Sequence, residues 1–294
     1  MQTLTPPPIP AQPPQLSSGG RTALRLTLIT IAALVVATTV AALGVTAWGV
    51  SALRVITDSQ ALPSTMRALV IDTARIPVAI RITADRETRE PKADLRLLNT
   101  THSGAHQLSV STVGGETRVT IAGNPGPMLA WARGGEITVA LPPDQARRLT
   151  VRTQQEFGAV IAQADLDQLE ARTNDGEIIL LGGARRIEVH TVDGSVTTRD
   201  PIAVSEQFIA STSDGDVTVD FRDTAPRSVE AITRNGDVAI GLPERGPYLV
   251  RTQTSGSTDV QVPETNSPDT AVAQIIARSS DGDVVVQQLS LRNR

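Results

Sequence analysis

The residues best suited to chemistry are acidic side chains beside a repeated glycine. They lie directly before or after that glycine, at Asp175, Glu177, Asp193, Asp214, Asp216, Asp237, Asp281 and Asp283. Carboxylate oxygens are ligands that Ca²⁺ prefers, so the row raises the question of a calcium site. Calcium-binding β-rolls, however, use a denser glycine and aspartate repeat. Solvated turn residues are therefore the favoured interpretation, and no metal site is predicted.

The histidines and the nearest acidic pair are the other candidates for chemistry. His102 and His106 have the spacing of two metal ligands on a helix, but the Thr, Ser and Gly residues around them favour a loop. His190 occupies an outward strand position, and no serine or carboxylate pairs with it by sequence. Asp165 and Asp167 are expected in a segment that connects strands. The sequence thus predicts no catalytic residue, no metal and no cofactor.

Composition excludes several classes of function. The absence of cysteine rules out disulfides, Cys-ligated zinc and thiol nucleophiles. The formal net charge is -4 and Lys92 is the only lysine, so there is no broad cationic surface for nucleic acid. Aromatic residues make up 2% of the chain, too few for sugar-stacking or base-stacking surfaces. We therefore expect no nucleic-acid partner.

The N-terminal part is predicted to anchor the chain in a membrane. Residues 1–20 are proline-rich and uncharged, which is typical of a disordered tail. No charge occurs from Leu26 to Leu53, and ~20 apolar residues suffice for a helix to cross a bilayer. This stretch is longer than the ~7 to 15 apolar residues of a cleavable signal peptide. We predict a transmembrane signal-anchor helix over residues 21–53.

This anchor sets the expected topology. The N-terminal tail is predicted to be cytoplasmic, residues 54–75 to form a juxtamembrane linker, and residues 76–294 to form an extracytoplasmic domain. Small residues at four-residue spacing could let two such helices pack closely, at Ala33, Ala37 and Ala41. The membrane is therefore one expected partner, and self-association through the helix is an open alternative to an ordinary alanine-rich span.

An internal repeat organises the remainder of the chain. Segments such as LEARTNDGEIIL, FIASTSDGDVTV and IIARSSDGDVVV align without gaps on a reference glycine. The reference glycines, predicted to form turns, are Gly115, Gly135, Gly176, Gly194, Gly215, Gly236 and Gly282. Looser copies occur at Gly158 and Gly256. Neighbouring copies lie ~20 residues apart, a period typical of repeat architectures.

The alternation around each glycine predicts which side chains face inward. Apolar residues recur seven and five positions before it, at Leu108, Met128, Leu169, Ile187, Phe208, Val229 and Ile275, and at Val110, Ala130, Ala171, Val189, Ala210, Ala231 and Ala277. The inward row resumes after the turn at Ile178, Val196, Val217, Val238 and Val284. Hydroxyl side chains recur three positions before the glycine, at Thr112, Thr173, Thr191, Thr212, Thr233 and Ser279, and could form a ladder at the corner.

This pattern predicts an all-β domain. A β-helix, or solenoid, of roughly nine ~20-residue coils is favoured, because identical short units stack naturally. An antiparallel β-meander or sandwich, in which each glycine lies at a hairpin tip, remains the alternative. The D-G-D-V-x-V strands behind an N-terminal membrane helix resemble the DUF4097-type family of bacterial adhesin-like proteins, over roughly residues 100–294. Residues 75–107 depart from the pattern and are expected to form a distinct cap.

The resemblance implies a surface-exposed β-solenoid with no catalytic residues to carry over. The leading hypothesis is thus a non-catalytic, adhesin-like or structural binding module at the bacterial cell surface, whose partner is a surface protein or a wall polymer. An envelope-sensing signalling component is one alternative. A β-helix enzyme that processes polysaccharides is another.

Overall fold

The computed structural model describes Thr39 and residues 53–100, 107–122 and 134–289. The chain divides into two units, Met1–Leu53 and Arg54–Arg294. The predicted tail and membrane span lie outside the described residues, apart from Thr39 and Leu53; so do Ala33, Ala37, Ala41, His102, His106, Met128 and Ala130. Within the part that is described, no helix has the length and apolarity needed to cross a bilayer.

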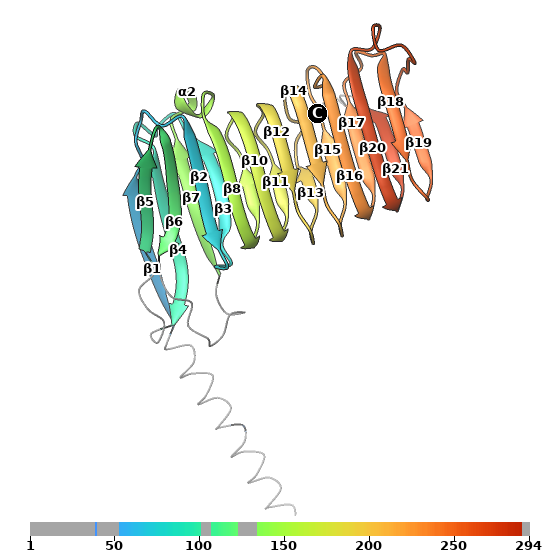
Figure 1. The fold of residues 1–294 in the computed structure, drawn as a ribbon. Coiled ribbons are helices and arrows are strands. Elements are labelled where there is room, and N and C mark those ends of the chain that lie inside the picture. The colour runs from blue at the N-terminus through green and yellow to red at the C-terminus, as the bar shows by residue number, and fades with distance from the viewer. Residues whose placement is uncertain (1–38, 40–52, 101–106, 123–133, 290–294) are drawn as a thin grey trace, which may run out of the picture. The chain divides into compact units, whose positions relative to one another are not determined.

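From Leu53 onward the described residues form two large mixed sheets and one helical turn, α2 (Pro143–Ala146), so the all-β prediction is confirmed (Figure 1). Sheet A has eleven strands, in the spatial order β1 (Leu53–Ala61), β4 (Lys92–Thr100), β7 (Gly135–Leu141), β3 (Ala79–Ala84), β9 (Val160–Ala162), β11 (Ile178–Leu180), β13 (Val196–Thr198), β15 (Val217–Asp220), β17 (Val238–Leu242), β21 (Val284–Gln288) and β19 (Thr258–Gln261). Sheet B has ten, in the order β5 (Gln107–Val113), β6 (Glu116–Ala122), β2 (Ala68–Ala74), β8 (Thr150–Phe157), β10 (Leu166–Asp175), β12 (Ala184–His190), β14 (Val204–Ser211), β16 (Ser228–Asn235), β20 (Ala273–Asp281) and β18 (Tyr248–Gln253).

Each repeat contributes one strand to sheet B and the next strand to sheet A, and such a pair is called a layer here. Neighbouring layers pair in parallel, with Leu169 opposite Ile187, Ile187 opposite Phe208 and Phe208 opposite Val229. Antiparallel pairing occurs at the N-terminal end, between β4 and β7 and between β5 and β6. Successive repeats therefore do not form the antiparallel meander considered as an alternative.

The predicted inward rows form the core between the sheets. Every predicted inward residue named above that the structure describes is buried, except Val110, which is half-buried. Small side chains such as Ala171, Ala210 and Ala231 alternate with larger ones, and the rings of Phe208 and Phe221 meet edge to face with centroids 5.2 Å apart. The period-two alternation thus predicted the core correctly, because side chains of a strand point to opposite faces.

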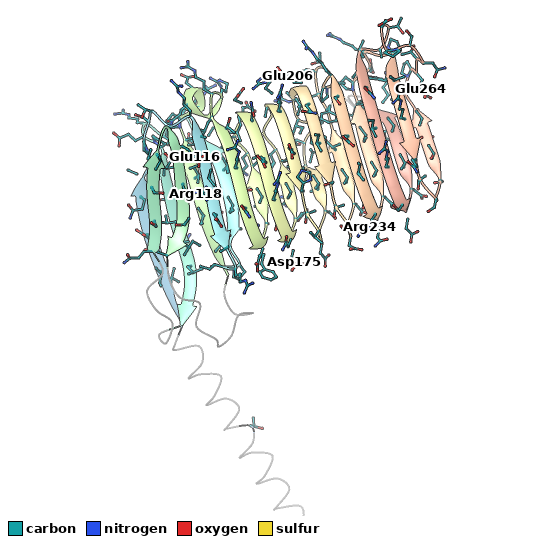
Figure 2. The ribbon with its side chains drawn as sticks, in the orientation of Figure 1. Glu116, Arg118, Asp175, Glu206, Arg234 and Glu264 are labelled. Atoms are coloured by element: carbon teal, nitrogen blue, oxygen red, sulfur yellow. The ribbon has the colours of Figure 1, made fainter. Side chains whose placement is uncertain are left out.

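Glycines of successive repeats lie directly against one another at one edge of the sheets. A Cβ added at Gly194 would lie 2.2 Å from the carbonyl oxygen of Gly176, and one added at Gly215 would lie 2.3 Å from that of Gly194. The same close approach continues in both directions, in the order Gly158, Gly176, Gly194, Gly215, Gly236, Gly282 and Gly256. We call this row the glycine stack. Figure 2 shows Asp175 and Arg234 at this edge and Glu206 and Glu264 at the opposite edge.

Gly115 and Gly135, both expected in the same kind of turn, lie elsewhere. Gly115 is in the hairpin turn between the antiparallel strands β5 and β6. Gly135 begins β7 and lies opposite Leu97 of β4, also antiparallel. Their sequence match reflects a shared need for glycine in a tight turn or a close approach, and such a need does not specify parallel stacking.

The recurring hydroxyls do not bond to each other along a ladder. Instead, each donates to the glycine carbonyl of the neighbouring layer: Thr212 Oγ1 to Gly194 (2.8 Å), Thr233 Oγ1 to Gly215 (2.8 Å) and Ser279 Oγ to Gly236 (2.7 Å). Thr112 is the exception, because it pairs with Thr117 Oγ1 in the hairpin. The other hydroxyl side chains are buried, and their hydrogen bonds join one turn to the next.

Two regions near the start of the domain differ from expectation. Residues 54–75, predicted as a linker, contain most of β1 and all of β2, and β2 lies between β6 and β8 within sheet B. Residues 75–107 contain β3, which pairs in parallel with β7 and β9 and so belongs to the stack. Both segments lack the glycine motif, although their strands alternate like the others. The turn between β2 and β3 nevertheless adjoins the glycine stack, since a Cβ added at Gly158 would lie 2.2 Å from Val78 O.

Candidate functional site: the charged outer face of sheet B

Outward side chains of six neighbouring strands of sheet B form a charged surface. The parallel register places Arg118, Val70, Arg152, Glu170 and Glu188 in one row across β6, β2, β8, β10 and β12. The adjoining row contains Asp72, Gln154, Arg172, His190 and Ser211. We call these two rows, with Glu116, the charged face. Its groups repeat every ~4.8 Å, the spacing of paired strands.

The charges of this face are paired with one another. Arg152 contacts Glu170 (3.1 Å), and Arg172 lies between Glu170 (2.9 Å) and Glu188 (3.4 Å). Arg118 lies 3.6 Å from Glu116. The side chains are about one-third to one-half exposed, so each pair adds about 0 to 1 kcal/mol to stability. Such weak pairs can be exchanged for contacts with a ligand.

Two shallow hollows lie side by side on the charged face. One, of about 170 Å³, is lined mainly by Val70, Glu116, Arg118, Arg152 and Glu170. The other, of about 130 Å³, also contains Arg152 and Glu170 and extends toward Arg186 and Gln207. Both are smaller than the ~300 to 1,000 Å³ of pockets that enclose small molecules. They fit single groups of a partner that lies across several strands.

A larger hollow of about 400 Å³ lies away from this face, between connecting loops. Pro201, Phe221, Pro243 and Leu289 contribute its apolar part, and Arg222, Asp223, Glu244 and Arg245 its charged part. Its four charged residues are exposed and carry both signs, and Phe221 is fully buried beneath it. This mixture of charges and apolar groups does not favour any one class of ligand.

His190 has partners that the sequence did not suggest. Its Nδ1 lies 2.6 Å from Ser211 Oγ, and its Nε2 lies 2.9 Å from Glu188 Oε1. The expectation that no serine or carboxylate pairs with it is therefore wrong. His190 and Ser211 both stand four positions before a reference glycine, Gly194 and Gly215. The repeat alignment, read across neighbouring layers, could have paired them.

The Ser211–His190–Glu188 chain has the order of a nucleophile, a base and an orienting carboxylate. The hydrogen bond from His190, helped by Arg172, lowers the pKa of Glu188. Acyl transfer also needs donors for an oxyanion, but the neighbouring N–H groups are engaged: Thr212 N–H donates to Ile232 O, and Ser213 N–H to Val192 O. The geometry thus supplies a cross-strand polar chain in which these two N–H groups already have acceptors.

The acidic pair weighed for catalysis is held by structural partners. Asp165 Oδ1 accepts the N–H of Gly183 (2.9 Å), and Asp167 accepts two hydrogen bonds from Arg185 (2.9 and 3.2 Å). Arg185 also bonds Glu206 (2.8 Å), which in turn accepts from Arg186. The hydrogen bond from Arg185 lowers the pKa of Asp167. These groups link the starts of β10, β12 and β14.

The carboxylates after the stacked glycines also serve the backbone. Asp216 Oδ1 accepts the N–H of Asp237 (2.9 Å), and Asp237 Oδ1 accepts the N–H of Asp283 (2.8 Å). Asp283 Oδ1 accepts the N–H of Ser257 (2.8 Å), which lowers the pKa of Asp283. Within the described ranges, no three His, Cys, Asp or Glu side chains are grouped so that they could hold a metal ion. Three members of the acidic row, Asp216, Asp237 and Asp283, thus accept hydrogen bonds from backbone N–H groups of the neighbouring layer.

Asp220 lies on the outer face of sheet A, and its pKa is shifted in the opposite direction to those of Asp167 and Asp283. It lies over Gly241 beside Leu289, and its carboxylate has no partner among the described residues. Burial raises its pKa. A raised folded-state pKa means that the charged form destabilises the fold at neutral pH, and that this penalty disappears as the pH falls below the unfolded-state value.

Asp220→Asn is therefore expected to stabilise the fold at pH 7, by about 1 kcal/mol or less because the site is half-exposed. The gain should vanish near pH 3, where Asp220 is already neutral. Urea melts at both pH values measure this. Asp167→Asn is the matched control and should have the opposite sign at pH 7, since the pKa of Asp167 is lowered. An equal gain from Asp220→Asn at both pH values would contradict the charge explanation.

Comparisons with known proteins give structural likeness alone. No protein-family model matches the chain, and no curated protein matches it. A structure named a "putative adhesin" from Bacteroides fragilis is similar with a TM-score of 0.48 and 13% identity, over 80% of this chain and 97% of that one. A "putative adhesin" from Parabacteroides merdae gives a TM-score of 0.43 and 10% identity, over 81% and 97%. A "putative lipid binding protein" from Parabacteroides distasonis gives 0.35 and 10%, over 81% and 97%. At these values the likeness decides nothing about function.

Proposed function

We propose that this chain is a membrane-anchored, extracytoplasmic β-solenoid that binds a polar, extended partner at the cell surface through the charged face. The solenoid assignment is supported by the parallel register between successive repeats and by the glycine stack. The anchor is supported by the uncharged stretch from Leu26 to Leu53, which ends where β1 begins. The N-terminal tail is then cytoplasmic and the strands lie outside.

The observation that carries the binding role is the charged face itself. Guanidinium, carboxylate and amide groups recur on it at strand spacing, over five neighbouring strands, and two hollows share Arg152 and Glu170. A wall polymer rich in hydroxyl and charged groups offers a matching repeat of hydrogen-bond donors and acceptors. With so few aromatic residues, recognition rests on hydrogen bonds and ion pairs, and it is weakened by salt.

The proposed role is non-catalytic. The N–H groups of Thr212 and Ser213, next to Ser211, are bonded to other carbonyls, and Asp165 and Asp167 are held by Gly183 and Arg185. A signalling role would involve the N-terminal tail, which lies outside the described residues. Binding through a preformed, stiff sheet face is the function that the described geometry supports best.

The test is co-sedimentation of the full chain, in detergent, with wall polymer prepared from the source organism. Arg152→Glu combined with Arg172→Glu adds two acidic groups beside Glu116, Glu170 and Glu188 on the charged face. It is expected to weaken binding at least tenfold, that is by about 1.4 kcal/mol. Arg278→Glu is the matched control: it makes the same change at an exposed arginine of β20, on the same side of sheet B but outside the charged face. It should leave binding unchanged.

The salt dependence provides a second measurement on the same samples. Raising the ionic strength from 0.05 to 0.5 M should release the wild-type chain from the polymer, because the face is solvent-exposed. Equal retention of the charged-face variant and the wild type at low salt would rule out this surface as the binding site.

A further inference from the structure

One layer of the stack lies between two layers that both precede it in the chain. β20 and β21 are the last strands of the sequence, yet β20 lies between β16 and β18, and β21 lies between β17 and β19 (Figure 1). The layer β18–β19, which precedes them in the chain, therefore lies beyond them. From β10 to β17, by contrast, each layer pairs with the one before it in the sequence. We call the position of residues 273–288 the insertion slot.

The insertion slot provides a complete binding site for two strands. Its occupant forms ladders with both neighbours in both sheets, from Ser228 opposite Gln274 to Asn235 opposite Asp281 on one side of β20. Its inward side chains are fully or almost fully buried, namely Ala273, Ile275, Ala277, Val284 and Val286. Ser279 Oγ donates to Gly236 O (2.7 Å). An empty slot would leave two pairs of strand edges and an apolar core uncovered.

All of these contacts are non-covalent, and the occupant is joined to the preceding strand only by residues 262–272. Several contacts of this loop are local, such as Thr265 Oγ1 to Thr270 Oγ1 (2.8 Å). It touches the layer β18–β19 near Tyr248, whose N–H donates to Pro263 O (2.8 Å). The same ladders would therefore form if the occupant belonged to another molecule, with the loop as the hinge.

From these observations we propose that the insertion slot binds residues 273–288 of a second copy of this chain, so that two copies exchange their last layers. The layers from β8 to β17 can pair as the chain is made, in sequence order. The insertion slot can be filled only after β18 and β19 exist, so it is the position that remains open to an identical segment from a neighbour. The partner is set by register and core shape, which no unrelated strand reproduces.

Introduced cysteines can detect the exchange, because the natural chain contains none. Glu230 and Ile276 are direct register partners across β16 and β20 and are not buried. Two full-length chains with different tags are co-expressed, one carrying Glu230→Cys and the other Ile276→Cys, and are then oxidised. A disulfide between them requires the last layer of one copy in the slot of the other. Exchange predicts a covalent heterodimer on a non-reducing gel.

A matched pair controls for chance collisions. Glu188 and Ile209 are register partners across β12 and β14, which follow chain order. Co-expressed Glu188→Cys and Ile209→Cys chains should give about tenfold less heterodimer than the first pair. A single chain with both Glu230→Cys and Ile276→Cys verifies the register, because the pair forms an internal disulfide in a closed copy and a disulfide between chains in an exchanged one. Internal closure alone without heterodimer from the first pair, no disulfide of either kind in the double-cysteine chain, or equal heterodimer from both pairs would each overturn the proposal.

Discussion

Val217→Asp is expected to unfold the domain or to lower its free energy of unfolding by about 4 kcal/mol. Val217 is fully buried in β15, opposite Val196 of one neighbouring layer and Val238 of the other. A carboxylate there loses its hydration and finds no cation in this apolar row. The loss is a large fraction of the ~5 to 15 kcal/mol that stabilises a typical domain. Urea melts of the unit Arg54–Arg294 measure it.

The matched control is the next residue. Thr218 lies on the exposed outer side of the same strand, so Thr218→Asp introduces the same charge into solvent. It should lower stability by about 1 kcal/mol or less, the range of strand propensity. Asp216→Asn should be nearly silent, because the amide keeps an oxygen that can accept the N–H of Asp237. Similar losses from Val217→Asp and Thr218→Asp would contradict the inward assignment.

Gly215→Ala is expected to lower the free energy of unfolding by about 3 kcal/mol or more, although it adds one methyl group. Gly215 has φ +144°, a conformation that residues with a Cβ rarely adopt. The new Cβ would also lie 2.3 Å from the carbonyl oxygen of Gly194, which is backbone and cannot rotate away. Because that carbonyl accepts the hydroxyl of Thr212, the displacement should disturb the adjoining turn as well.

Alanine substitutions at two other glycines separate backbone strain from close approach as causes of the expected loss of stability. Gly114 has φ +59° but has nothing within 4 Å of an added Cβ, so Gly114→Ala should cost about 1 to 2 kcal/mol, from backbone strain alone. Gly176 does not have such a φ, but an added Cβ would lie 1.8 Å from Gly158 O, so Gly176→Ala tests close approach alone. Thermal melts that rank Gly114→Ala as the most damaging would show that the glycine stack is not tightly packed.

The conformation of the stacked turns explains why the motif is so regular. The carbonyl of each glycine both accepts a hydroxyl hydrogen bond and faces the next glycine, as at Gly194, Thr212 and Gly215. A side chain at the glycine would break the second contact, and loss of the hydroxyl would leave a buried carbonyl without its partner. Both residue types must therefore recur together for the layers to approach each other.

The charged face could be predicted in part. Alternation identifies Arg152, Glu170 and Arg172 as outward residues, but a charge pair between strands depends on register, which the repeat alignment gives only when it is read across layers. His190 illustrates this: its partners Ser211 and Glu188 follow from that alignment, yet neither adjoins it in the sequence. Asp72 and Val70 of β2 could not be placed at all, since their segment lacks the glycine motif.

The sequence alone determined the all-β class, the inward rows and the need for glycine at the turns, because these follow from local rules. Alternation decides which side of a strand is buried, and a glycine is required wherever two turns meet closely. Tertiary structure decided which layers are neighbours. The repeat alignment gives the register of a strand such as β20 with any other repeat, but it does not say which repeats are its neighbours. Its place between β16 and β18 was therefore decided by the assembled sheets.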